Sequence, residues 1–176
     1  KLKKALLKND IGTNQYSKSF IENNFCMEGI AYDFCDSVTS KITVLEDFNL
    51  LNSDLVIEDD DVIIFTGNTR IKNSHIFSRN GGMLVQIGGE ILMENVIIDG
   101  LKNVILPNTN WTGAVNLIKA KANLSNVTIK NISGEDALNS VHASVKINGH
   151  LEFKNIESDA YDSDFSDVYF DTIECF

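Results

Sequence analysis

Residues 87–98 read IGGEILMENVII, and this stretch decides the fold. Apolar or small side chains occur at every second position from Ile87 to Met93, and then again one and three residues after Asn95. A period of two is typical of a strand that buries one face. The phrase recurs as VLEDFNLLNSDL (44–55), FTGNTRIKNSHI (65–76), IKAKANLSNVTI (118–129) and INGHLEFKNI (147–156). Self-similarity at a spacing of about 20–50 residues predicts a solenoid.

Every copy carries an asparagine at the same offset, and these asparagines are 21, 22, 31 and 29 residues apart. Asparagine tolerates a left-handed backbone better than other non-glycine residues, so it suits a bend between two strands. Amides that stack on one another can also form hydrogen bonds along the stack. We therefore predict a structural ladder along one corner of the solenoid, formed by Asn52, Asn73, Asn95, Asn126 and Asn155.

The repeat predicts an all-β parallel β-helix over residues 41–176. A short alternating strand is not stable alone, but coiling pairs each strand with its copy one turn earlier and directs the apolar side chains inward. A second corner, where a large side chain would not fit, is predicted at Gly67, Gly89, Ala120 and Gly149. A β-sandwich is the alternative, since it also has short strands and polar turns. A sandwich does not require the same residue at the same offset, which favours the β-helix.

The segments GGEILMENVIIDG (88–100) and ANLSNVTIKNIS (122–133) resemble repeat units of the right-handed parallel β-helix, or pectin-lyase-like, superfamily. The closest likeness is to large surface and adhesin-like proteins of that fold. The resemblance implies a right-handed solenoid, and it covers residues 41–176. It says little about function, because enzymes, fibres and inert stalks share the repeat.

Residues 1–40 do not fit the repeat, and we expect an N-terminal cap or the end of a preceding domain there. Cys26 and Cys35 lie in this segment, and in an exported protein they would form a local disulfide. Burial as free, small apolar residues is the alternative. The last residues, 168–176, read as the opening of another unit, so we expect a β-helix that is truncated at its C-terminus and belongs to a longer protein.

Composition limits the partners. The chain has 15 basic and 25 acidic residues, a net charge of −10, which argues against nucleic acid. No apolar run approaches the roughly 18–20 residues of a membrane span.

Four aspartates close together, with serines between them, could bind calcium, although the EF-hand order of ligands is missing. A polar loop without metal is the alternative interpretation of Asp159, Asp162, Asp164 and Asp167.

Glycan acceptor patterns would be used if the protein passes through a secretory pathway. Four Asn-x-Ser/Thr sites occur, and Asn126 is needed in the ladder. The best candidates for glycosylation are therefore Asn110, in the long insertion after Ile105, and Asn131. These sites, with the resemblance, lead us to expect an extracellular or cell-surface glycoprotein.

Catalysis is the main alternative, because the fold hosts polysaccharide lyases and glycoside hydrolases. A hydrolase needs two or three carboxylates in one cleft, at equivalent outward positions of neighbouring turns. The repeat instead predicts a Glu90–Lys121–Glu152 column of complementary charges. Arg70 and Lys72 resemble a substrate-binding motif of polygalacturonases, but the acidic and histidine motifs that precede it in that family are missing.

The sequence thus predicts a non-catalytic, stiff scaffold for adhesion within a larger surface or matrix protein, with no cofactor other than calcium. Its partners would be proteins or glycans in a larger assembly, contacted by loops at residues 106–113 and 134–142. The alternative is a carbohydrate-active enzyme of the pectin-lyase-like fold.

Overall fold

The computed structural model describes residues 42–58, 60–106, 109 and 111–176. The predicted cap and the cysteines at positions 26 and 35 lie outside the described residues. Every element in the described part is a β-strand, which confirms the all-β prediction. This part of the chain therefore has no helix of the length and hydrophobicity that a membrane span requires.

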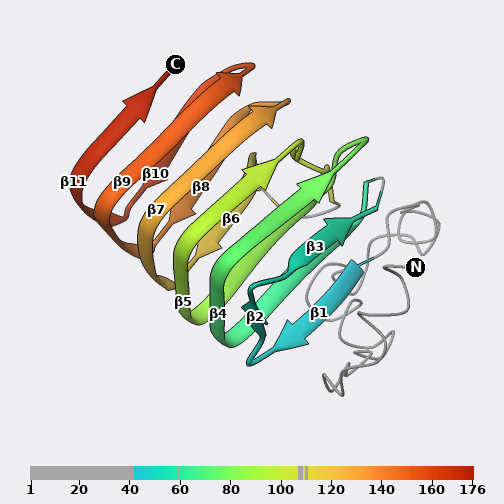
Figure 1. The fold of residues 1–176 in the computed structure, drawn as a ribbon, viewed down its shortest axis with the longest axis horizontal. Coiled ribbons are helices and arrows are strands. Elements are labelled where there is room, and N and C mark those ends of the chain that lie inside the picture. The colour runs from blue at the N-terminus through green and yellow to red at the C-terminus, as the bar shows by residue number, and fades with distance from the viewer. Residues whose placement is uncertain (1–41, 59, 107–108, 110) are drawn as a thin grey trace, which may run out of the picture.

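The strands wind into a parallel β-solenoid of about six turns (Figure 1). Each strand pairs in parallel with the strand one turn away, as the repeat predicts. The long strands bend at corners instead of ending there, so several contribute to more than one face. The strands are β1 (Ile42–Glu46), β2 (Asn49–Leu51), β3 (Asp54–Ile57), β4 (Val62–Ser78), β5 (Met83–Asp99), β6 (Gly113–Ile118), β7 (Lys121–Ile132), β8 (Asp136–Val141), β9 (Ser144–Ile156), β10 (Asp159–Asp164) and β11 (Asp167–Cys175).

Each turn contributes to three parallel faces. Face A contains β1, the first segments of β4 and β5, and then β6, β8 and β10. Face B contains β2, the middle of β4 and β5, and the first halves of β7, β9 and β11. Face C contains β3 and the last segments of β4, β5, β7, β9 and β11.

Apolar side chains form columns inside the solenoid. One column on face B runs Leu50, Ile71, Met93, Leu124 and Ile147, each in register with the next and each at most 6% exposed. Full burial of such a side chain contributes about 1.5–3 kcal/mol. The interior therefore supplies most of the stability that a single alternating strand lacks.

Face A is covered on its outer side as well. Val104 and Leu106 pack on the outward residues Val62, Ile64 and Val85 of the sheet. The extra residues between the third and fourth copies of the repeat thus form a cover. A parallel sheet that is buried on both sides reads as a continuous apolar run, and the start of β4 does so.

The second predicted contact loop is wrong, whereas the contact role of the first stays a prediction. Leu106 is 3% exposed, so the first loop begins inside the cover. Most of the second is β8, in which Ala137 and Leu138 belong to the core. A strand on face A that does not alternate between apolar and polar residues lacks the pattern of a strand that buries one face. In the sequence it therefore resembles an insertion between two copies of the repeat.

Candidate functional site

One corner of the solenoid carries a ladder of amides. Nδ2 of Asn73 donates to Oδ1 of Asn52 at 3.1 Å, Asn95 donates to Asn73 at 2.9 Å, and Asn126 donates to Asn95 at 3.2 Å. All four residues have φ between 48° and 53°. The side chain therefore satisfies two requirements at once: it tolerates the left-handed bend and it bonds to the turn before.

Asn155 belongs to a different corner, which corrects its predicted place in this ladder. Its amide donates to Asn131 at 3.0 Å, and Asn131 donates to Asp99 at 2.7 Å. Gly149 occupies the ladder position after Asn126, and its N–H donates to Asp171. The register shifts between Ser125 and Val127 at this corner, so the last copies of the repeat cannot be aligned by their asparagines alone.

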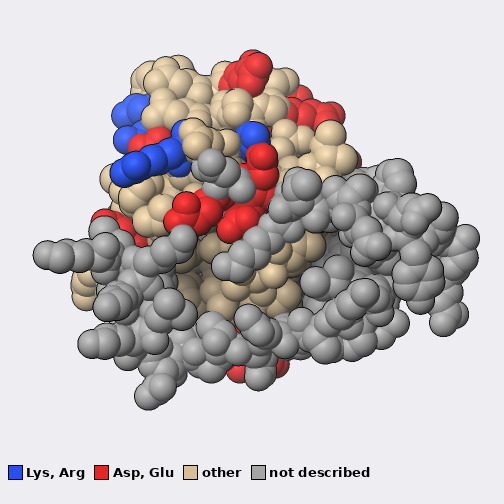
Figure 2. All heavy atoms as spheres, turned by 90° about the vertical axis from the view of Figure 1, so that its right-hand side faces the viewer, with Lys and Arg blue, Asp and Glu red and all other residues tan. Residues whose placement is uncertain are grey.

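Outward charges on faces B and C pair between turns. Lys72 lies 2.9 Å from Glu94, and Lys130 lies 3.2 Å from Asp99. Figure 2 shows acidic and basic side chains lying side by side where described residues are visible on one end of the molecule. Glu90 and Lys121 are in register, as predicted, but Glu152 lies opposite Thr128, so the predicted column ends at Lys121.

Asp99 has the strongest set of partners among these carboxylates. Partial burial raises its pKa, but hydrogen bonds from Asn131 and Lys130, and the charges of Lys130 and His75, outweigh burial and lower the pKa below its usual value. The ionised form of Asp99 is therefore favoured by the fold.

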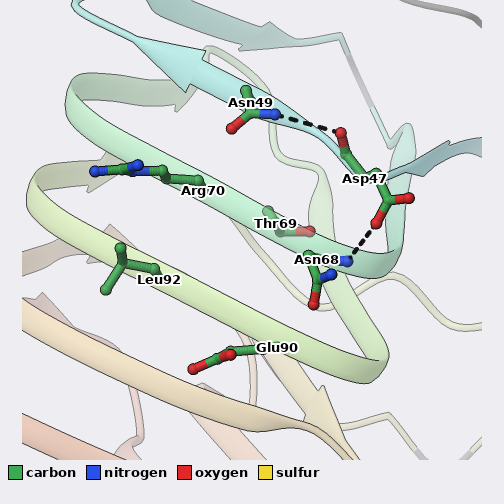
Figure 3. A pocket seen from close by; sticks show the side chains of 7 residues that line it. All are labelled: Asp47, Asn49, Asn68, Thr69, Arg70, Glu90 and Leu92. Atoms are coloured by element: carbon green, nitrogen blue, oxygen red, sulfur yellow. Dashed lines mark hydrogen bonds between the residues drawn. The ribbon is translucent and has the colours of Figure 1, made fainter.

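A shallow groove lies on face B, lined by described residues. It has a volume of about 430 Å³ and lies between the first three turns (Figure 3). Asp47 Oδ1 accepts from the Asn68 N–H at 2.8 Å, and Glu90 accepts from Asn123 at 2.9 Å. Arg70 is exposed, with no ion pair to any described residue. The groove thus offers separated donors and acceptors; its lining residues are Asp47, Asn49, Asn68, Thr69, Arg70, Glu90 and Leu92.

The predicted calcium ligands do not converge. Asp159, Asp162 and Asp164 lie along β10, and Asp167 begins β11 after the corner at Phe165. An extended strand and a corner spread these carboxylates apart, whereas a calcium loop wraps its ligands around the ion. None of the four belongs to a group of three metal-ligating side chains in the described part of the chain.

A different trio does converge. One ligand atom from each of His150, Glu152 and Glu174 lies within 4.8 Å of the others, and His150 Nε2 is 3.4 Å from Glu174. Glu152 also contacts Lys154 at 2.7 Å and accepts from the Thr128 hydroxyl at 3.2 Å. The hydrogen bond from Lys154 is the main reason that the pKa of Glu152 is lowered.

The predicted glycosylation sites and the cysteines differ in where they lie. Asn110 lies outside the described residues. Asn131 is exposed, but its amide nitrogen and oxygen both take part in the second ladder. Cys175 is an exposed free thiol. Glycosylation and the Cys26–Cys35 disulfide remain predictions.

Buried polar residues on face A are a feature that the sequence interpretation missed. Asn116 is fully buried and bonds to both backbone groups of Gly113, while Asn139, in register with it, donates to Asp136 and Thr112. The signal was present, because GAVNLI (113–118) and DALNSV (136–141) place asparagine at the same offset.

No protein-family model, curated protein or solved structure matches this chain. Its functional interpretation therefore rests on its own residues and on the register of its strands.

Proposed function

We propose that the chain is a non-catalytic, stiff scaffold segment of a larger extracellular surface or adhesin-like protein, built on a right-handed β-helix of the pectin-lyase-like kind. The amide ladder carries the proposal. It joins four successive turns through residues that also set the bend of each turn. The resemblance of the repeats to surface proteins supports the extracellular location.

Stiffness follows from the direction of the bonds. In a parallel solenoid the backbone hydrogen bonds between turns run along the axis, and the apolar columns pack in the same direction. Bending the rod would open one face and separate these contacts. Ion pairs such as Lys72–Glu94 also join neighbouring turns.

Stiffness can be measured by pulsed electron paramagnetic resonance between spin labels on Cys175 and on Leu51→Cys, with Cys26 and Cys35 replaced by serine. Leu51 is 49% exposed and lies in β2, near the other end of the solenoid. A single narrow distance distribution is expected. A broad or multiple distribution would refute the rod. Labelling of intact source cells with antibody tests the surface location, and staining only after permeabilisation would refute it.

Carbohydrate binding or turnover in the groove is the second candidate function. The observation that favours it is the guanidinium of Arg70, which is exposed, lines the groove and has no ion pair to any described residue. Exposed donors and acceptors at Arg70, Asn68 and Glu90 suit a ligand rich in hydroxyls.

A polysaccharide panel tests this candidate, with binding and release of reducing ends as the readouts. Arg70→Ala should abolish binding if the groove is the site. Lys72→Ala is the matched control, since Lys72 pairs with Glu94 outside the groove. Binding that survives Arg70→Ala would remove the groove from consideration.

A further inference from the structure

We propose that His150, Glu152 and Glu174 bind a zinc ion that joins the strands β9 and β11. Their ligand atoms lie within 4.8 Å of one another, close enough for one ion to contact all three after small side-chain rotations. The side chains are 39%, 17% and 43% exposed, so an ion can reach them from solvent.

The register of β9 and β11 creates the site. Glu174 pairs directly with Glu152, and parallel strands are about 4.8 Å apart. Like charges directly opposite one another destabilise a sheet, so a cation between them would relieve the repulsion. Earlier turns place Asp54, His75, Ile97 and Thr128 in the same column, so Glu152 and Glu174 are its one pair of carboxylates on neighbouring described strands.

Other carboxylates on this surface form ion pairs with lysines of a neighbouring strand. Glu94 is paired with Lys72, and Asp99 with Lys130, in both cases from the neighbouring strand. Glu152 is paired with Lys154 on its own strand, and the ion-pair partner of Glu174 is His150. The two glutamates together thus have one lysine, and a histidine that is charged only when it is protonated.

The types of ligand atom indicate which metal ion the site would bind. One imidazole nitrogen and two carboxylate oxygens suit zinc, which takes such ligands and leaves a fourth position for water. Calcium prefers six to eight oxygen ligands, and this trio offers one nitrogen. The Thr128 hydroxyl, which donates to Glu152, would fix the orientation of that carboxylate as outer-sphere partners of metal ligands do.

Zinc would hold the turn that contains β11 to the turn that contains β9. This consequence deepens the scaffold function and rests on it, but the binding itself does not. If zinc fails to bind, the rigidity measured between spin labels is unaffected, so the two proposals can fail separately.

Zinc sulfate titrated against a chromophoric chelator tests the site, in a chain whose three cysteines are replaced by serine. His150→Ala and Glu174→Gln should each weaken zinc binding at least tenfold. His75→Ala is the matched control, because His75 lies beside Asp99 and Lys130 and belongs to no group of three metal-ligating side chains among the described residues. This variant should bind zinc as the parent does.

Lys154→Gln provides an independent arm. Lys154 competes with the ion for Oε1 of Glu152, so its removal should strengthen zinc binding. Cobalt as a stand-in should give a visible absorption band in the parent and lose it in His150→Ala. The proposal is overturned if His150→Ala and Glu174→Gln bind zinc like the parent, or if Lys154→Gln does not tighten binding.

Discussion

At the scale of single residues, the ladder asparagines have two roles. Their backbone adopts the left-handed conformation of the bend, and their side-chain amides form hydrogen bonds to neighbouring turns. Asn95 has φ 53°, donates to Asn73 and accepts from Asn126. Glycine would keep the bend and lose the amide bonds, whereas valine would lose both. The two contributions can therefore be separated at one position.

We expect Asn95→Gly to lower the free energy of unfolding by about 1 kcal/mol, the net value of the lost hydrogen bonds. Asn95→Val should cost about 1–3 kcal/mol more, because a β-branched residue is strained in the left-handed region. Urea denaturation of both variants measures the difference. Equal costs would show that the bend at Asn95 does not depend on asparagine.

Alanine substitutions at two adjacent glycines distinguish the cost of backbone strain from the cost of steric overlap. Gly88 and Gly89 both have φ 60°, but a Cβ on Gly88 would meet nothing within 4 Å, while a Cβ on Gly89 would lie 1.9 Å from the carbonyl oxygen of Gly67. Both alanine variants share the strain of the left-handed backbone, about 1–2 kcal/mol. Only Gly89→Ala must also push two turns apart.

Gly89→Ala should therefore be less stable than Gly88→Ala by about 1–3 kcal/mol, a typical cost of overpacking. Thermal unfolding of the pair measures this. Similar melting temperatures would mean that the turns can separate at this corner without loss.

At the scale of elements, β4, β5 and β7 are joined on face C by the Asp99 cluster. Lys130 and His75 come from the strands on either side of Asp99. Because the pKa of Asp99 is lowered by folding, its contribution to stability is fully present above the unfolded pKa near 3.8 and is lost as pH falls through the lower folded value.

Asp99→Asn should thus destabilise the protein at pH 7. The effect should be much smaller at pH 3, where the Asp99 carboxylate contributes less to the stability of the folded state. Urea midpoints at the two pH values measure this. Glu135→Gln, at an exposed carboxylate, is the control and should follow the parent at both. A constant deficit for Asp99→Asn across this range would contradict the assignment.

Sequence reasoning succeeds where an element buries one face and fails where it buries two or none. The middle of β5 alternates, so its register with β4 and β7 was predictable from Asn73, Asn95 and Asn126. On face A, β8 is buried at five of its six positions and does not alternate, so its sequence pattern predicts a loop where the structure has a strand. Asn155 lies outside the ladder because a shifted register puts Gly149 at the asparagine corner.

The candidate sites were harder to predict, because they depend on pairing between turns. The trio at His150 exists only because β11 puts Glu174 opposite Glu152, and that register is not visible until the last copies are aligned. The four aspartates of the predicted calcium site are near neighbours in sequence, but an extended strand and a corner keep them apart.

At the scale of the whole molecule, stability should vary along the axis. β5 pairs with β4 on one side and with β6 and β7 on the other, whereas β11 pairs with β9 alone among the described strands. In a solenoid each turn is stabilised by its neighbours, so a strand with one neighbour opens more easily.

Hydrogen exchange measured by mass spectrometry should show amides at residues 96–98 exchanging at least tenfold more slowly than those at 173–175, which occupy the same columns of face C. Added zinc should slow exchange at 173–175 more than at 96–98. Equal protection of the two segments without zinc would show that the 176-residue chain unfolds as one unit.

The equal length of two successive turns has a consequence for how such a gene can change. Lys121 pairs with Ser144 and Ser144 with Asp167, so two successive turns both take 23 residues (144 − 121 and 167 − 144). A tandem duplication of 69 coding nucleotides, three per residue, would insert one complete turn, with every inward column continued and every corner kept. Unequal recombination could therefore lengthen or shorten the rod in steps of about 4.8 Å, without a new core having to be selected.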